Sequence, residues 1–268
     1  MLVCNNNDRE HSSQNSSNLK KNLPDDFHAV IFTGGLFAPP QNTKKYWADT
    51  GQPDFIAAAD SGLEICDLYC EFYKNEYDFF PDIITGDFDS LTSPALIEKY
   101  KIKPDVFPCD KDFTDTELAV ASVYKEAQKH GVKNPHITLV GGDGGRTDHL
   151  LNIYDSFAAE KHVSVWLTKE QGLYLLKDGF SCDIFELGIE DIVSVARTSA
   201  SRTKGALRSE GLVWEANCFR KEGMPSLSNR ISQEFYDLSK PVRFCAKGAD
   251  FLVIAPLSAV VIMSKSAF

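Results

Sequence analysis

Short apolar runs alternate with amphipathic stretches from residue 27 to about residue 168. The apolar runs predict strands at 29–33, 55–59, 82–85, 105–107, 136–140 and 163–168. Apolar positions at helical spacing predict helices at 62–73, 93–101, 114–130 and 147–160. Strands separated by helices of this length form right-handed crossovers and a mainly parallel sheet. The pattern therefore predicts an N-terminal Rossmann-like layered α/β domain.

The pattern changes after about residue 168. Short apolar or alternating runs follow at 173–176, 182–185, 192–196, 242–246, 251–254 and 259–263. Gly, Pro, Asp and Ser separate these runs, and long amphipathic helices are missing, which indicates a C-terminal antiparallel β-sandwich domain. We expect an α/β domain at 27–168 and a sandwich domain at 169–268. Residues 1–26 are rich in Asn, Ser, Lys and Asp, which is typical of a disordered tail.

Composition narrows the classes of partner. The formal net charge of -10 argues against a nucleic-acid surface, which needs a basic stripe. The seven cysteines include no Cys-x-x-Cys pair, which favours a reducing compartment. No apolar run has the length of a membrane span, and the start lacks the apolar core of a secretory signal. We therefore expect a cytoplasmic protein without nucleic-acid or membrane partners.

Three acidic clusters follow predicted strands, so a parallel sheet would deliver them to one edge. In the first, at 86–90, Gly86 permits a sharp turn before Asp87 and Asp89. Hard carboxylate oxygens suit Mg²⁺, but ordinary turn residues explain this segment alone equally well. The Asp-x-Asp pattern also resembles the nucleophile of haloacid-dehalogenase-type phosphatases. Leu91 departs from that family's pattern, which disfavours a phosphoaspartyl enzyme.

The other two clusters open helices. Thr114 and Glu117 form a Thr-x-x-Glu capping box with Asp115 in the first turn, where helix capping and a metal or substrate role carry similar weight. At 141–149, glycines precede Arg146 and Asp148. Glycines allow a phosphate to approach the backbone, and the arginine fork suits phosphate oxygens. A plain glycine turn is the alternative, although it leaves Arg146 and Asp148 without a role.

Together these motifs resemble the thiamine pyrophosphokinase family over about 28–265. The motifs that carry the resemblance are Ala-Asp-Ser-Gly at 59–62, Gly-Asp-Phe-Asp-Ser at 86–90, Asp-x-Thr-Asp at 112–115, Gly-Gly-Arg-x-Asp-His at 144–149, Gly-Leu-Val-Trp at 211–214 and Ser-Asn at 228–229. The resemblance implies an α/β domain, a β-sandwich, and a homodimer with active sites between subunits. It further implies transfer of the pyrophosphoryl group of ATP to the hydroxyl of thiamine, with Mg²⁺ required and AMP released.

The resemblance also implies residue roles. The expected catalytic residues are Asp87, Asp89, Asp115, Arg146 and Asp148. The expected ATP-binding residues are Asp60, Ser61, Gly86, Thr114, Gly144, Gly145 and Arg146. The expected metal ligands are Asp60, Asp87, Asp89 and Asp115, and the expected thiamine contacts are Trp214, Ser228 and Asn229. Two alternatives stay open: another Mg²⁺-dependent phosphotransferase or phosphatase, and a non-catalytic nucleotide-binding module.

Overall fold

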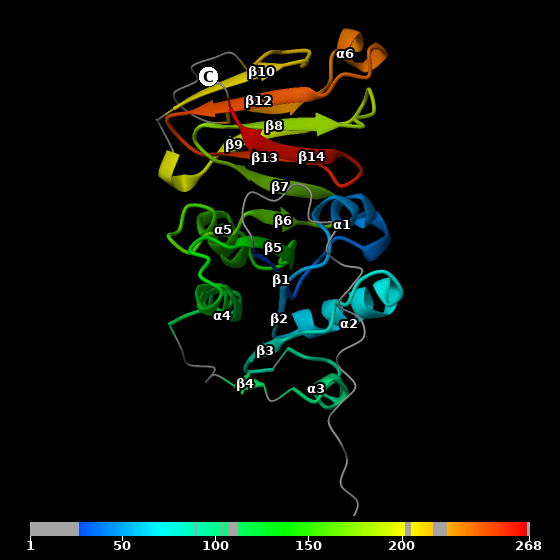
Figure 1. Cartoon of the computed structure of the whole chain (residues 1–268), viewed down its shortest axis with the longest axis vertical. Coiled ribbons are helices and arrows are strands. Elements are labelled where there is room, and N and C mark those ends of the chain that lie inside the picture. Colours follow the sequence, from blue (N-terminus) through cyan, green and yellow to red (C-terminus); the bar gives the residue numbers. More distant parts are fainter. Residues whose placement is uncertain are drawn as a thin grey trace, which may run out of the picture.

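The computed structural model describes residues 27–88, 90–102, 104–106, 112–201, 205–216 and 224–266. The expected disordered tail at 1–26 lies outside the described residues. The described chain forms a ten-stranded sheet and a separate four-stranded sheet (Figure 1). The larger sheet runs through both halves of the chain.

The N-terminal half of the large sheet is parallel and follows the order β6-β5-β1-β2-β3-β4. Its strands are β1 (His28–Thr33), β2 (Phe55–Ala59), β3 (Ile83–Gly86), β4 (Asp105–Val106), β5 (His136–Gly141) and β6 (Val165–Leu167). The predicted parallel sheet is confirmed, with strand ends that shift by one or two residues. Phe107, predicted as the end of one strand, lies outside the described residues.

Helices cover both faces of the parallel strands. They are α1 (Lys44–Thr50), α2 (Gly62–Tyr73), α3 (Ala95–Tyr100), α4 (Asp115–Lys129) and α5 (Thr147–Ser156). Figure 1 shows α4 and α5 on one side of the sheet and α1 and α2 on the other. Within β1, Val30 and Phe32 pack into one core, whereas Ala29 and Ile31 pack into the other. Burial on both faces explains why these strands are continuous apolar runs.

The large sheet changes direction after β6. Strand β7 (Gln171–Leu176) pairs with β6 in an antiparallel hairpin, with Val165 opposite Tyr174. The sheet then continues through β13 (Phe251–Pro256), β9 (Val193–Arg197) and β11 (Ser226–Asn229). The reversal lies at the position where the sequence pattern changes. The expected division into two domains at residue 168 stays a prediction.

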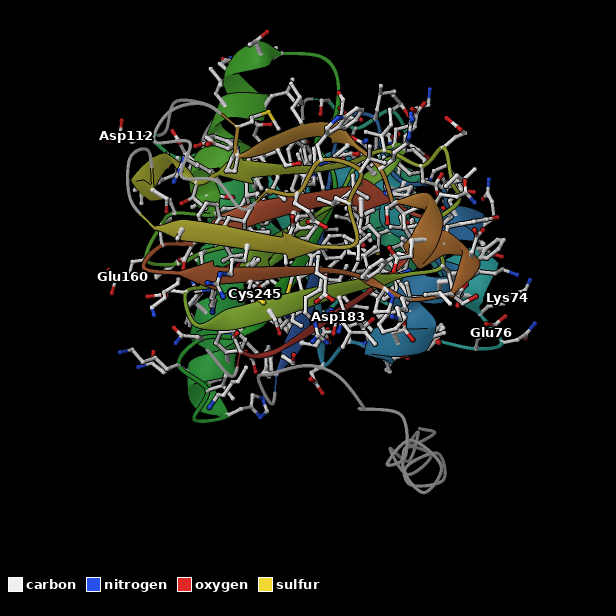
Figure 2. All side chains as sticks on the ribbon, turned by 90° about the horizontal axis from the view of Figure 1, so that it is seen from above. Lys74, Glu76, Asp112, Glu160, Asp183 and Cys245 are labelled. Atoms are coloured by element: carbon white, nitrogen blue, oxygen red, sulfur yellow. The ribbon has the colours of Figure 1, made fainter. Side chains whose placement is uncertain are left out.

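A four-stranded antiparallel sheet completes the sandwich. Its order is β10 (Ala206–Glu210), β12 (Val242–Lys247), β8 (Phe180–Phe185) and β14 (Val260–Lys265). Figure 2 views this sheet from above, with Asp183 on β8 and Cys245 on β12. Buried Phe244 and Cys182 from this sheet belong to the same core cluster as Val253 from the large sheet. The predicted fold class, a Rossmann-like α/β half followed by an antiparallel sandwich, is confirmed.

Some short elements were not predicted from the sequence. They are α1, the 3₁₀ helices at Pro40–Asn42 and Ser199–Ser201, β10, β11 and α6 (Gln233–Asp237). Each has a weak apolar signal: α1 buries only Trp47 and Thr50, and α6 buries none of its residues. The predicted helix at 147–160 ends earlier, at Ser156. Within the described ranges, no helix is long and apolar enough to cross a bilayer.

The buried face of β12 gives a test of the sandwich core. Phe244 is fully buried, so we expect Phe244→Ala to lower the free energy of unfolding by about 3–5 kcal/mol. Phe244→Leu keeps most of the buried volume and should cost less than about 1.5 kcal/mol. Urea denaturation of both variants measures the difference. Equal losses would show that Phe244 does not fill the space between the sheets.

Candidate active site

Asp60 follows β2 directly and begins the site. Its backbone lies in the left-handed region, with φ of 50°, and its N–H donates a hydrogen bond to the carbonyl oxygen of Thr85 (2.8 Å). The Ser90 hydroxyl donates a hydrogen bond to Asp60 Oδ2. Asp60 Oδ1 is buried and has no hydrogen-bond partner among the described residues. A left-handed aspartate with an unpaired buried oxygen is typical of a ligand site.

Gly86, the last residue of β3, lets the next acid lie beside Asp60. Its φ is +149°, and a Cβ on it would lie 3.1 Å from the Asp60 Cα and 3.2 Å from the Asp60 Cβ. A larger residue would therefore push the two strand ends apart. Asp87 follows at once and is partly buried.

Asp115 comes from the start of α4, which is fixed by the predicted capping box. Glu117 N–H donates to Thr114 Oγ1 (3.2 Å), and Thr114 N–H donates to Glu117 Oε2 (2.8 Å). The Asn152 side-chain amide also donates to Thr114 Oγ1 (3.4 Å). The capping box is thus confirmed, and because it fixes the first turn of α4 it also fixes Asp115.

Three of the expected metal ligands converge. Asp60, Asp87 and Asp115 each offer a carboxylate oxygen, and these oxygens lie within 4.8 Å of one another. Two ligands on opposite sides of Mg²⁺ are about 4.2 Å apart, since each Mg–O bond is about 2.1 Å. The three carboxylates therefore fit one divalent cation after small side-chain rotations, and a cation would also satisfy Asp60 Oδ1. Asp89, the fourth expected ligand, lies outside the described residues.

A cleft of about 250 Å³ adjoins this cluster at the carboxyl ends of the parallel strands. Of the expected site residues, it is lined by Asp60, Ser61, Thr114, Asp115, Gly144, Gly145 and Arg146. It is also lined by Ser90 and His149, which belong to the quoted motifs but had no expected role, and by residues outside those motifs: Thr33, Gly34, Gly35 and Asn152. The Gly34-Gly35 pair could have been predicted as part of the site from the sequence, because it follows a strand directly, as the glycines after β5 do.

The glycine loop forms one wall of the cleft. Gly144 and Gly145 have φ of 68° and 71°, and a Cβ on Gly145 would meet nothing within 4 Å. Asp143 holds the loop, because its Oδ1 accepts from Gly144 N–H (2.7 Å) and its backbone pairs with Leu36. Open space at Gly145 leaves room for a group such as a phosphate to approach the backbone.

Arg146 and Asp148 bind each other. Arg146 Nε donates to Asp148 Oδ1 (3.1 Å), and Arg146 Nη2 donates to Asp148 Oδ2. Both side chains are exposed. This charged hydrogen bond lowers the pKa of Asp148 to about 2. Arg146 lines the cleft, whereas Asp148 is not among the lining residues.

The expected thiamine contacts lie apart from the cleft, since none of them lines it. Asn229 is buried and uses its amide to join neighbouring segments: Nδ2 donates to Trp214 O (2.6 Å), and Oδ1 accepts from Trp214 N–H (3.3 Å). Trp214 is 60% exposed, with the Arg230 guanidinium 5.8 Å from its ring centre. Ser228 has φ of 52° and is also exposed. Within one described chain, Trp214 and Ser228 thus face solvent rather than the acidic cluster.

The fold and the cleft define a two-part class of protein: a Rossmann-like α/β half, with an acidic, glycine-lined cleft at its carboxyl edge, joined to an antiparallel sandwich. Residues 43–167 match the family model described as thiamin pyrophosphokinase, catalytic domain. This match supports the thiamin pyrophosphokinase family for the chain. Members of this family use ATP and a metal, and membership implies a diphosphotransferase.

Solved structures support the same fold. Thiamin pyrophosphokinase from Candida albicans aligns with a TM-score of 0.60 at 17% identity, over 86% of this chain and 89% of that one. Thiamine pyrophosphokinase from Bacillus subtilis aligns with a TM-score of 0.60 at 20% identity, over 85% and 98%. Yeast thiamin pyrophosphokinase aligns with a TM-score of 0.53 at 15% identity, over 89% and 88%. At these identities the likeness concerns the fold.

The Arg146–Asp148 pair predicts a pH response. The folded-state pKa of Asp148, about 2, lies below the ~3.9 of an unperturbed aspartate. The pair's contribution to stability is therefore present above about pH 4 and is lost as the pH falls toward 2. We expect an NMR titration of the Asp148 carboxyl to give a pKa of about 2 in the wild type, rising toward ~3.9 in Arg146→Gln. Arg243→Gln, the control, should leave it unchanged, and an equal change in both variants would exclude Arg146 as the cause.

Proposed function

We propose that this chain is a thiamine pyrophosphokinase that transfers the pyrophosphoryl group of ATP to the hydroxyl of thiamine, giving thiamine diphosphate and AMP. The observation that carries the proposal is the convergence of Asp60, Asp87 and Asp115 beside the glycine-lined cleft. Family membership supports it, because members use ATP and a metal. We further propose that the α/β half at 27–168 binds ATP and the metal, that the sandwich half binds thiamine, and that the protein works in the cytoplasm.

The acidic cluster has a defined part in this reaction. Asp60, Asp87 and Asp115 would hold Mg²⁺, with Asp89 as a further proposed ligand. Bound there, Mg²⁺ would neutralise phosphate charge and help to align the β-phosphorus with the attacking oxygen. Thr114 and Glu117 keep Asp115 at the cleft through the capping box. Ser90 orients Asp60 by donating to its Oδ2.

The transfer forms a bond between the thiamine oxygen and the β-phosphorus and breaks the bond to the α-phosphate oxygen, which leaves with AMP. The hydroxyl proton needs an acceptor. Asp115 and Asp148 are both among the expected catalytic carboxylates, and Asp115 is the better placed of the two because it lines the cleft and Asp148 does not. We therefore propose Asp115 as the group that orients or deprotonates the hydroxyl.

Arg146 would bind phosphate while it stays hydrogen-bonded to Asp148. A guanidinium carries five N–H donors, and Asp148 accepts from two of them. The remaining donors are available to phosphate oxygens at the rim of the cleft. Asp148 then serves as a positioning residue that fixes the direction of Arg146, and open space at Gly145 supplies the close approach.

Substitutions of the acidic cluster test the proposal. We expect Asp60→Asn and Asp87→Asn each to lower Mg²⁺-dependent AMP formation from ATP and thiamine by at least about 100-fold, because a neutral amide does not hold the cation or offset phosphate charge. Asp112→Asn is the matched control, since Asp112 is exposed and lies outside the cluster. The assay measures thiamine diphosphate and AMP together.

The outcomes of that assay separate the alternatives. AMP release with other alcohols but not with thiamine would indicate a different phosphotransferase. ATP binding without turnover would indicate a nucleotide-binding module. Near-normal thiamine diphosphate formation in both aspartate variants would remove these residues from the metal site.

The exposure of Trp214 supports a homodimer in this proposal. Because it is exposed and does not line the cleft of its own chain, we propose that a second copy supplies Trp214 and Ser228 to the thiamine site of a homodimer. A cationic aromatic ring stacked on Trp214 would gain about 0.5–2 kcal/mol.

Subunit mixing tests this arrangement. Asp87→Asn and Trp214→Ala are each expected to be impaired alone, whereas an equal mixture that exchanges subunits should recover about a quarter of the wild-type activity. The recovery arises because half of the dimers are hybrids, each with one intact site. Trp214→Phe, which keeps an aromatic ring, is the control for the Trp214 substitution. Lack of recovery despite demonstrated subunit exchange would place both residues in one chain's site.

A further inference from the structure

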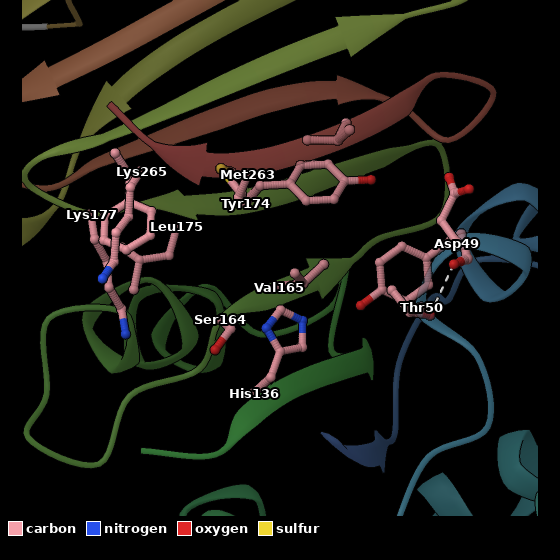
Figure 3. Close-up of a pocket in the computed structure, with 13 residues that line it drawn as sticks. Asp49, Thr50, His136, Ser164, Val165, Tyr174, Leu175, Lys177, Met263 and Lys265 are labelled. Atoms are coloured by element: carbon pink, nitrogen blue, oxygen red, sulfur yellow. Dashed lines mark hydrogen bonds between the residues drawn. The ribbon is translucent and has the colours of Figure 1, made fainter. Parts of the chain in front are cut away.

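A second pocket lies at the opposite end of the parallel strands from the acidic cleft. It has a volume of about 310 Å³ and is bounded by α1, β5, β6, β7, β8 and β14 (Figure 3). The two hollows share no lining residue. His136, the first residue of β5, lines this pocket, whereas the glycine loop follows the last residue of β5, roughly 17 Å away along the strand. The pocket is therefore separate from the proposed ATP and metal site.

The middle of the pocket is apolar. Tyr174 and Met263 lie on one wall, and Val165 lies across from them (Figure 3). Phe180 and Leu175 extend this lining. The volume is at the lower end of the range for small-molecule sites, and an apolar wall flanked by polar and charged groups suits a ligand with an apolar body and a polar end. Such a lining suits a flat organic body of one or two rings.

His136 supplies a polar group in this lining. Its ring enters the pocket from the start of β5 (Figure 3). Burial, followed by the nearby His28 and Lys177, lowers the pKa of His136 well below 6.5, so the ring is neutral. Its Nε2 is buried and has no hydrogen-bond partner among the described residues. A neutral imidazole offers one donor and one acceptor nitrogen.

One end of the pocket is cationic. Lys177 and Lys265 lie together there, and Asp49 lies at the other end (Figure 3). The register of β8 and β14 explains the convergence, since Lys265 pairs with Phe180, which follows the turn that carries Lys177. Within the described ranges, neither lysine side chain forms a hydrogen bond or ion pair. Two unpaired ammonium groups beside an apolar cavity form a complement to an anion.

We propose that this pocket binds a small organic anion, whose planar apolar body lies between Tyr174 and Val165 and whose carboxylate or phosphate meets Lys177 and Lys265. The proposal is independent of the proposed enzymatic function, because it uses none of the residues of the acidic cleft. His136 would hydrogen-bond a polar atom on the ligand body. Asp49 at the far end would disfavour a second anionic group there.

Calorimetry on the full chain tests the proposal with three probes: 2-naphthoate, phenyl phosphate and the neutral 2-naphthamide. We expect at least one anionic probe to bind and the amide to bind at least about tenfold more weakly. Tighter binding of 2-naphthoate would assign a carboxylate, and tighter binding of phenyl phosphate would assign a phosphate ester.

Substitutions test whether the anionic probe binds in this pocket. Lys177→Gln with Lys265→Gln should weaken the anionic probe at least about tenfold, and Met263→Trp, which fills the cavity, should abolish binding. Lys125→Ala, an exposed lysine on α4, is the matched control and should bind as the wild type does. Circular dichroism checks that each variant is folded. The proposal is overturned if neither anion binds, if binding survives the double lysine substitution unchanged, or if binding disappears in Asp60→Asn, which would assign the probe to the acidic cleft.

Discussion

The acidic site depends on the contact between the Gly86 backbone and Asp60. Parallel pairing of β2 and β3 places Ala59 beside Thr85, so the residues that follow leave the sheet side by side. At Gly86 a side chain would meet the Asp60 backbone at about 3.1 Å. A side chain there would force the neighbouring backbone to move by a few tenths of an ångström and would strain the positive φ of this position, so glycine keeps the two acidic segments close together. The convergence of the carboxylates is thus explained by the register of β2 and β3 and by the absence of a Cβ at Gly86. Neither feature depends on charge.

Several energetically unfavourable features lie beside the contact between Gly86 and Asp60. Asp60 has a left-handed backbone and a buried oxygen without a partner, and Phe88 also has a positive φ of 62°. Such features cost free energy and persist when the surroundings enforce them, here through the β2–β3 pairing and the Ser90 hydrogen bond. Stability alone gives no reason for them. A cation held between the carboxylates gives one, which is why the cluster supports the proposed metal chemistry.

The sequence was informative where one local signal decides the structure. Alternation of apolar runs predicted the layered sheet, and Thr114 with Glu117 predicted the cap that fixes Asp115. The sequence was uninformative where contacts between distant segments determine the structure. Strand β11 reads Ser-Leu-Ser-Asn and is held by pairing with β9 and by the Asn229 amide. The hydrogen bond between Arg146 and Asp148 was also not predicted, because each residue was considered as a ligand-binding group and not as a partner of the other.

Strand β5 connects the two pockets, and its position limits how they influence each other. It lies between β1 and β6 and is paired with both, so a shift in its register would break two ladders and turn its buried side chains to the wrong face. His136 at one end and the glycine loop at the other are therefore joined by a rigid element with a single arrangement. Coupling needs an element with two arrangements that both ligands bias. Since β5 does not supply one, the two sites should bind their ligands independently.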